Sequence, residues 1–229
     1  MSALRSVIAT PSAAESFADI LARVPRDAER AGISDRLFST IAQTVSPQGI
    51  AALVEVHPPP LEAVLSLHHA VLVVACGLQD PGNLGTILRT AEALGAAAVI
   101  CLKSTVSPSN PKVLRACGGA VFRLPVFAGV ETMQLFGAMR RANICIIAAD
   151  RESSARVDEA DLRGAVAFLI GSEAGGLAAE VAGNAELRLS IPAAAKINSI
   201  NAAMAAGIFL YEAARQRGFR GQIEGDDAG

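Results

Sequence analysis

The sequence has no apolar run long enough to cross a membrane. Its most continuous apolar stretches, such as AVLVVAC at residues 70–76, fall far short of the roughly 20 residues of a transmembrane helix. The first residues, MSALRSVIATPSAAES, lack the long apolar core of a secretory signal peptide. Hydrophobic residues still make up 52% of the 229 residues, which predicts a sizeable core. We therefore expect a globular, cytoplasmic protein.

Metal-binding and disulfide motifs are also missing. The four cysteines form no CxxC pair, and the three histidines belong to no HExxH motif and lie near no cysteine cluster. Cys76, Cys101 and Cys145 fall inside or at the ends of apolar runs. This pattern favours buried free thiols, so we expect neither a metal site nor a disulfide framework.

The chain has no excess of positive charge, because its formal net charge is −2. This argues against a strongly basic nucleic-acid binder but leaves room for a local basic patch. Of the 20 basic residues, 17 are arginine, which suits bidentate phosphate contacts, although genome composition would explain the bias equally well.

The usual nucleotide loops are absent too. Gly77, Gly82 and Gly85 do not form G-x-G-x-x-G, and no acidic residue ends the following strand-like run. No loop contains the G-K-[ST] of a Walker A motif. An oxidoreductase or NTPase that uses NAD or ATP is therefore disfavoured.

What is present is an alternation of strand-like and helix-like segments after residue 69. The strand-like runs are apolar throughout, which is typical of a parallel sheet covered by helices on both faces. Expected strands cover residues 70–76, 96–102, 122–127, 143–150, 165–171 and 186–191, and expected helices cover 83–95, 110–120, 130–142, 177–185 and 200–214.

A smaller unit precedes this alternation. Strands are expected at residues 6–9 and 49–57, and helices at 16–24 and 35–45, the first of them introduced by a Ser12–Glu15 capping box. The prolines of HPPPLEAVLSLHH interrupt the pattern and place a domain junction near residues 57–68. We therefore predict a small α/β domain at 1–66, a larger α/β domain at 67–217 and a flexible tail at 218–229.

Three loops rich in glycine and polar residues follow predicted strands: GLQDPGNLGTILR, GSEAGGL and IPAAAKINSIN. Each could be plain turn chemistry, but ligands bind beyond the carboxyl ends of parallel strands, so one shared site is predicted. The third loop places Lys196, Asn198, Ser199 and Asn201 just before or at the start of an apolar helix. One of these side chains would suffice as a helix cap, which leaves the others for a functional role.

The same loops carry a resemblance. DPGNLGTILRTAEALGA (80–96), IGSEAGGL (170–177) and IPAAAKINSINAAMAAGIFLYE (191–212) resemble the three motifs of the SpoU, or TrmH-like, RNA ribose 2′-O-methyltransferases of the SPOUT superfamily. KVLRACGGAVFRLPV (112–126) resembles a further segment of that family. Residues 1–66 resemble, more weakly, its small substrate-binding domain and look shorter than a complete one.

The resemblance implies an α/β fold with a deep C-terminal trefoil knot, S-adenosylmethionine as methyl donor, an rRNA or tRNA substrate and a homodimer. It implies that the backbone of the second and third loops holds the donor. Where the family usually has Met after Ile-Pro, this chain has Ala193, which implies altered packing rather than lost donor binding. The implied donor-binding residues are Leu169, Ile170, Gly171, Ser172, Glu173, Gly175, Ile191, Pro192, Ala193, Ser199, Ile200 and Ala202.

By the same resemblance Arg89 is the catalytic arginine, proposed in the family to act as a base once an RNA phosphate engages it. Because a guanidinium is effectively never deprotonated, phosphate binding and stabilisation of an alkoxide are the more conservative roles. A surface pair of Arg89 with Glu92, at i,i+3, is the plain alternative. Asn83 precedes Arg89 by six residues, or roughly 120° off alignment on a helix, so both would border one site only if Asn83 sits in the loop.

The remaining candidates are Glu173, Ser199 and Asn201 for the catalytic site, and Lys112, Arg115 and Arg123 as RNA phosphate contacts beside Asn83 and Arg89. Glu173 has the alternative role of a helix N-terminal carboxylate, and the basic residues that of plain solvated charge. Two functions therefore stay open: an RNA 2′-O-methyltransferase, or a non-catalytic RNA-binding or ribosome-assembly protein that keeps the knotted fold.

Overall fold

The computed structural model describes residues 2–42, 44, 46–172, 175–193 and 200–219. The chain divides into two compact units, residues Met1–His57 and Pro58–Gly229. None of the helices in the described ranges is long and apolar enough to cross a bilayer.

The first unit is a three-stranded sheet with short helices. Its strands are β1 (Ser2–Ala9), β2 (Glu29–Gly32) and β3 (Ile50–Val56), in the order β2-β1-β3. β1 pairs with β2 in parallel and with β3 antiparallel. The helices are α1 (Pro11–Ser16), α2 (Ala18–Ala22) and α3 (Asp35–Ile41). Its core cluster has only three buried members, namely Val7, Val24 and Ala28.

The predicted capping box is wrong. Helix α1 starts at Pro11, and its N-cap is Thr10, whose Oγ1 accepts a hydrogen bond from Ala13 N at 3.3 Å. Ser12 therefore lies inside the first turn rather than before it. Proline at the first helical position explains the earlier start, because its fixed φ suits a helix and its missing N–H costs nothing there.

The second unit is built on a six-stranded sheet in which every pairing is parallel. The strand order is β6-β5-β4-β8-β7-β9. The strands are β4 (Val71–Cys76), β5 (Ala98–Leu102), β6 (Val126–Val130), β7 (Cys145–Ala149), β8 (Val166–Gly171) and β9 (Leu187–Leu189). All residues of β4 and β5 are buried, as expected of strands covered on both faces.

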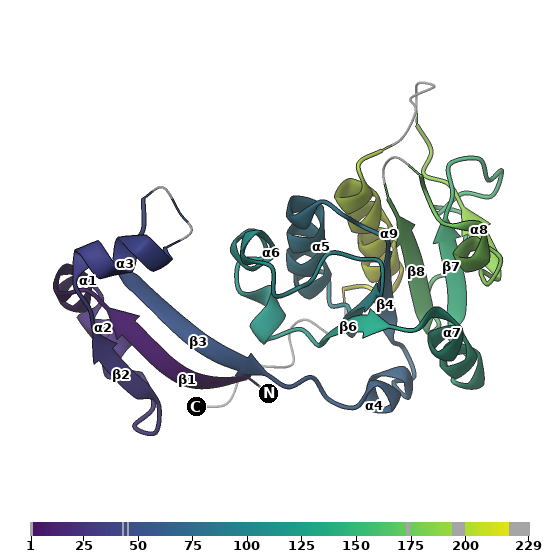
Figure 1. Cartoon of the computed structure of the whole chain (residues 1–229). Coiled ribbons are helices and arrows are strands. Elements are labelled where there is room, and N and C mark those ends of the chain that lie inside the picture. Colours follow the sequence, from purple (N-terminus) through teal and green to yellow (C-terminus); the bar gives the residue numbers. More distant parts are fainter. Residues whose placement is uncertain (1, 43, 45, 173–174, 194–199, 220–229) are drawn as a thin grey trace. The chain divides into compact units, whose positions relative to one another are not determined.

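Helices cover both faces of this sheet (Figure 1). One face packs against α5 (Pro81–Ala93), α6 (Pro111–Ala116) and α9 (Ala202–Gln216). The other packs against α4 (Leu61–Leu65), α7 (Thr132–Arg141) and α8 (Ala179–Ala182). Side chains of β4 alternate between the two cores, as the period of two requires: Val71 and Val73 lie in the first, Leu72 and Val74 in the second. The predicted α/β class with helices on both faces is confirmed.

The expected strand at residues 122–127 begins later than predicted. Phe122 ends a short 3₁₀ helix, η1 (Ala120–Phe122), and Leu124 N donates to Ala120 O at 2.8 Å. Pro125 has no N–H to contribute to a ladder, so β6 begins only at Val126. Local hydrogen bonding thus overrides the apolar pattern of FRLPVF.

Candidate active site

The order of the strands brings two of the three loops together. β5 and β6 lie on one side of β4, whereas β8, β7 and β9 lie on the other, so the order reverses between β4 and β8. Cys76 at the end of β4 is paired with Gly171 at the end of β8. The loops after these strands therefore leave the sheet side by side, at the kind of switch point where parallel α/β sheets bind ligands.

The third loop reaches the same place through helix α9. Asn201 is the N-cap of α9, and its Oδ1 accepts hydrogen bonds from Ala203 N at 3.0 Å and Met204 N at 3.2 Å. Its Nδ2 donates to Asn83 Oδ1 at 2.9 Å, across 118 positions of sequence. One side chain thus caps the helix and joins the first and third loops.

Asn83 does not sit in the loop. Asp80 is the N-cap of α5, its Oδ1 accepts from Asn83 N at 2.7 Å, and Pro81 is the first helical residue. Asn83 therefore lies inside the first turn, and the roughly 120° between it and Arg89 directs the two side chains to different neighbours. Asn83 contacts Asn201, whereas Arg89 lies against Gly118.

The glycine loop after β8 folds back tightly on itself. Ser172 and Gly176 exchange backbone hydrogen bonds of 3.0 and 2.8 Å, and Gly175 N donates to Ser172 Oγ at 3.2 Å. A Cβ on Gly171 would overlap the backbone of Gly176. Gly176 has a φ of +62°, a left-handed conformation that glycine adopts without strain. The described residues of this loop, Gly171, Ser172, Gly175 and Gly176, have small side chains or none, which leaves their main-chain groups accessible to a nucleoside ligand.

The cofactor candidates in the described ranges differ in which of their parts are available to a ligand. Leu169 and Ile170 are buried, and their side chains belong to the two cores, so only their backbone can meet a ligand. Gly171, Ser172, Ile191 and Ile200 are half-buried, Gly175, Pro192 and Ala193 are exposed, and Ala202 is buried. Glu173 and Ser199, like Lys196 and Asn198, lie outside the described residues.

Arg89 has an exposed side chain with no ion-pair partner among the described residues. A Cβ built on Gly118 would lie 3.7 Å from both Cδ and Nε of Arg89, so the arginine packs along this glycine. Glu92 does not pair with Arg89. Its carboxylate instead binds Arg123, through Nε and through Nη2 at 2.9 Å. These two hydrogen bonds raise the pKa of the Arg123 guanidinium.

Two further basic candidates lie on helix α6. Lys112 and Arg115 are exposed on α6, and Arg115 lies in its last turn. Neither forms an ion pair with a described residue. Together with Arg89 and Arg123 they place four basic residues on or beside the contact between α5 and the segment from α6 to η1.

The cysteines near the site are not nucleophiles. Burial raises the pKa of Cys76 to about 12, and burial likewise raises the pKa of Cys101 to about 12. Both thiols therefore stay protonated near neutral pH, where only a thiolate would react.

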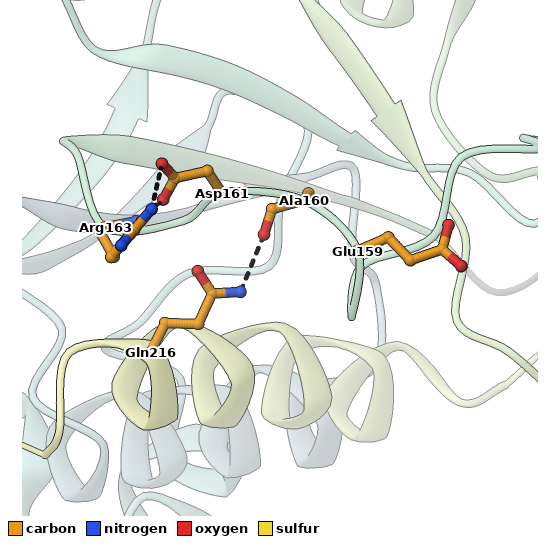
Figure 2. A pocket seen from close by; sticks show the side chains of 5 residues that line it. All are labelled: Glu159, Ala160, Asp161, Arg163 and Gln216. Carbon is orange, nitrogen blue, oxygen red and sulfur yellow. Dashed lines mark hydrogen bonds and ion pairs between the residues drawn. The ribbon is translucent and has the colours of Figure 1, made fainter.

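A pocket of about 300 Å³ lies away from this site. It is lined by Glu159, Ala160, Asp161, Arg163 and Gln216. Figure 2 shows Gln216 reaching Ala160 O, at 2.8 Å, and Arg163 paired with Asp161. Gln216 is the last residue of the 15-residue α9, whose first turn meets Asn83. A helix of this length separates the two places by roughly 20 Å. The pocket is therefore not part of the candidate active site.

Several residues at the site were missed from the sequence. Gly118 and Gly119 were predicted as the end of a helix and as part of the family-like segment 112–126, but with no role of their own. Both have positive φ, +59° and +84°, and both lie against an arginine. Thr105 ties the loops after β4 and β5 together, because its Oγ1 accepts from Gly77 N and donates to Ala75 O. The available signal was the i, i+4, i+7 spacing of Gly85, Arg89 and Glu92 on one face of α5.

The fold and this gathering of loops define a parallel α/β protein that binds its ligands at the switch point of the sheet. The chain belongs to the SpoU rRNA methylase family, whose pattern matches residues 70–211. It is 34% identical over 205 residues to the 23S rRNA (guanosine-2′-O-)-methyltransferase RlmB of Xylella fastidiosa strain 9a5c, covering 85% of this chain and 82% of the relative. It is 30% identical over 193 residues to the 23S rRNA (guanosine(2553)-2′-O)-methyltransferase RlmP of Bacillus subtilis, covering 82% and 75%.

Solved structures of related methyltransferases are similar to this chain as well. The SpoU methyltransferase AviRb of Streptomyces viridochromogenes, in complex with AdoMet, has a TM-score of 0.85 and 27% identity over 94% of this chain and 83% of its own. An AdoMet-bound rRNA methyltransferase of Sinorhizobium meliloti has a TM-score of 0.80 and 30% identity, over 93% and 80%. The likeness to SpoU structures implies the trefoil knot as well.

The chain is thus an S-adenosylmethionine-dependent RNA ribose 2′-O-methyltransferase that acts on rRNA or tRNA. The resemblance in the three motifs is confirmed, and so are the methyl donor and the RNA substrate.

Proposed function

We propose that this enzyme methylates the ribose 2′-hydroxyl of a guanosine in 23S rRNA. The support is its similarity, along most of its length, to two relatives that are named for this reaction. The hydrogen bond between Asn83 and Asn201 carries the assignment of the site, because it joins the first and third motifs beside the second. Acting on nascent ribosomal RNA would place the enzyme in the cytoplasm.

The backbone of Gly171, Ser172, Gly175 and Gly176, with residues 191–193 and 200–202, would hold the donor. S-adenosylmethionine supplies an electrophilic methyl group attached to a sulfonium. The protein must then fix the ribose hydroxyl in line with that group and stabilise the oxyanion that develops as the hydroxyl loses its proton. The proposed roles of Glu173 and Ser199 are to order this loop and the target nucleotide.

Arg89 is assigned the electrostatic role. It is an exposed guanidinium on helix α5, within the first motif, and the described residues give it no carboxylate to neutralise it. Because arginine keeps its charge, it can bind a phosphate and stabilise the alkoxide without acting as a base.

The test is transfer of labelled methyl from S-adenosylmethionine to protein-free 23S rRNA, 16S rRNA and tRNA. Arg89→Ala should lower kcat by a factor of about 100 or more, the usual cost of one lost stabilising donor. Binding of S-adenosylmethionine, measured by calorimetry, should remain. Arg163→Ala, an exposed arginine far from the site, is the matched control.

Mapping the product distinguishes the assignments. A 2′-O-methylguanosine in 23S rRNA supports the proposal, whereas methylation only of tRNA or 16S rRNA would refute it. RNA binding without transfer, and without affinity for the donor, would favour a non-catalytic assembly role.

We also propose that the enzyme is a homodimer. The exposed side of α9 is apolar for a surface helix: Met204 is 61% exposed and Tyr211 is 52% exposed. Light scattering after gel filtration should give twice the chain mass, and Met204→Glu with Tyr211→Glu should give a monomer. A wild-type monomer at micromolar concentration would refute it.

A further inference from the structure

The face of α5 that carries Gly85, Arg89 and Glu92 is covered by α6 and the turn after it. At Gly85 the two helices touch, since a Cβ there would overlap Ala116 Cβ and stand 3.0 Å from Val113 O. One turn further along α5, Arg89 lies against Gly118. Another turn on, Glu92 binds Arg123. These three contacts along one face of α5 therefore determine where the Gly118–Gly119 turn crosses the helix, and in which direction.

The Gly118–Gly119 turn has the shape of an anion-binding backbone. Cys117 is right-handed, with φ −75° and ψ −9°, and Gly118 follows with φ +59°. A right-handed residue followed by a left-handed one turns successive N–H groups toward one concave side. Within the described chain, neither Gly118 N nor Gly119 N donates a hydrogen bond. A residue other than glycine would be strained at either of these positive φ values.

Two guanidinium groups flank the turn. Arg89 packs along Gly118, and Nη1 of Arg123 would lie 3.1 Å from a Cβ on Gly119. Arg123 uses Nε and Nη2 for Glu92, and Nη2 also lies 3.4 Å from Gly118 O. Its Nη1 donates to no described atom, so this edge faces the turn with its hydrogens available. Arg89, Arg123 and Glu92 together carry a net charge of +1.

We propose that the Gly118–Gly119 turn binds one backbone phosphate of the RNA between Arg89 and Arg123, and that Glu92 is the positioning residue that holds Arg123 there. The inference rests on the proposed function for the presence of RNA. The C-terminal end of α6 carries a partial negative charge, which disfavours an anion at this turn. The helix has only six residues, and this partial charge, roughly half an elementary charge, is smaller than the full positive charge of either arginine.

The direction in which Glu92→Gln changes the affinity for RNA tests the positioning role. If Glu92 were only a surface carboxylate, Glu92→Gln would remove a negative charge near RNA and tighten binding. If Glu92 positions Arg123, the same change frees that side chain to move and weakens binding. The two interpretations therefore predict opposite directions for one variant.

The experiment uses the full chain and protein-free 23S rRNA. Methyl-transfer kinetics give KM and kcat, and filter binding between about 50 and 300 mM KCl gives the salt dependence of the binding constant. Arg123→Gln should raise KM for RNA roughly tenfold, more than it lowers kcat, and should reduce the slope of log K against log salt by about 0.7–0.9. Glu92→Gln should raise KM about three- to tenfold. The double variant should be no worse than Arg123→Gln, because the two residues act as a unit.

Asp161 and Arg163 provide matched controls. Arg163 binds Asp161 with the same two atoms, Nε at 2.9 Å and Nη2 at 3.0 Å, and both side chains are exposed (Figure 2). Arg163→Gln and Asp161→Asn should leave KM and the salt slope at wild-type values. Thermal unfolding and calorimetry with S-adenosylmethionine show whether each variant is folded.

An unchanged KM and salt slope in Arg123→Gln would overturn the phosphate site. An unchanged or lowered KM in Glu92→Gln would overturn the positioning role. The proposed function fails in a different way: wild-type protein would then transfer no methyl to 23S rRNA, while the salt slopes of RNA binding could still be compared.

Discussion

At the scale of single residues, polar side chains in this protein perform two tasks at once. Asn201 caps α9 and also holds Asn83, so a helix start and a contact between motifs depend on one amide. The question raised by the polar entrance of α9 is answered at this residue. The cap need not come from Asn198 or Ser199, and its remaining N–H₂ group links the loops.

Asn201 can be tested by separating its two tasks. Asn201→Ala should lower stability by about 1 kcal/mol through the lost cap, or about 2–4 °C in Tm, and should also reduce methyl transfer. Asn201→Ser keeps a capping oxygen but is too short to reach Asn83, so it should restore Tm without restoring transfer. Differential scanning calorimetry and a methyl-transfer assay measure the two effects. Full activity in Asn201→Ser would show that the contact with Asn83 is dispensable.

A buried carboxylate makes stability depend on pH. Only 10% of the Glu212 side chain is exposed, and it accepts hydrogen bonds from Arg215 at 2.7 and 2.8 Å and from Gln216 at 2.8 Å. The Arg215 hydrogen bonds lower the pKa of Glu212, although burial opposes this. A folded-state pKa below the unfolded one means that the stabilisation is complete above the ordinary pKa and is lost as pH falls through the folded value.

Glu212→Gln should therefore destabilise the enzyme by about 1.5–3 kcal/mol at pH 7, the range for hydrogen bonds to a charged group. The deficit should shrink as pH falls from 7 to below the ordinary glutamate pKa, because the wild-type carboxylate then becomes protonated. Urea unfolding across this range measures it. Glu159→Gln, at an ion pair whose carboxylate is 63% exposed, is the control and should have no measurable effect. An equal deficit at both ends of the range would contradict the linkage.

At the scale of elements, a glycine sets the distance between α5 and α6. Gly85→Ala gains helix propensity of about 1 kcal/mol, but the new methyl overlaps Ala116, and overpacking costs about 1–3 kcal/mol. We expect net destabilisation and, because α6 leads to the Gly118 turn, a raised KM for RNA. Gly207→Ala in α9 is the comparison, since its Cβ would meet only Thr90 Cγ2 at an ordinary 3.5 Å. That variant should be neutral or slightly stabilising in thermal unfolding, and the opposite order would refute the packing argument.

The sequence predicts elements best where burial alone determines them. Strands β4, β5, β7 and β8 are found within two residues of their predicted ends, because an apolar run buried on both faces has no competing conformation. β2 was missed because ERAG is exposed at every position and has no hydrophobic pattern. The strand at 122–127 was misplaced because Leu124 N bonds back to Ala120 O, a local choice that hydropathy does not record.

For the site, too, some features could be predicted from the sequence and others could not. That three loops meet could be predicted, because parallel strands end at one edge and the motifs resemble a family. That Asn83 faces Asn201 while Arg89 faces Gly118 could not be predicted, because it depends on the helix starting at Pro81 rather than Asn83. Likewise, the partner of Glu92 lies 31 residues away, and no local spacing reveals it.

At the scale of the whole molecule, the two units differ in how much they bury. The apolar cluster of the first unit has three buried members, supported by the partly buried Leu4, Leu21 and Ile50. The second has two extensive cores on either side of its sheet. A unit of fewer than about 70 residues rarely obtains more than 3–5 kcal/mol from one core, so the first unit should be the less stable.

Native-state hydrogen exchange can measure this difference directly. Amides of β1 and β3 should exchange with opening free energies no greater than about 5 kcal/mol, whereas those of β4 and β8 should approach the global value. Urea should correspondingly unfold the chain in two steps. If the first unit is the substrate-binding domain, as we infer, added 23S rRNA should slow exchange in β1 and β3 by binding the folded form. Equal protection in all four strands, with a single transition, would mean that the smaller core does not limit stability and that the units unfold together.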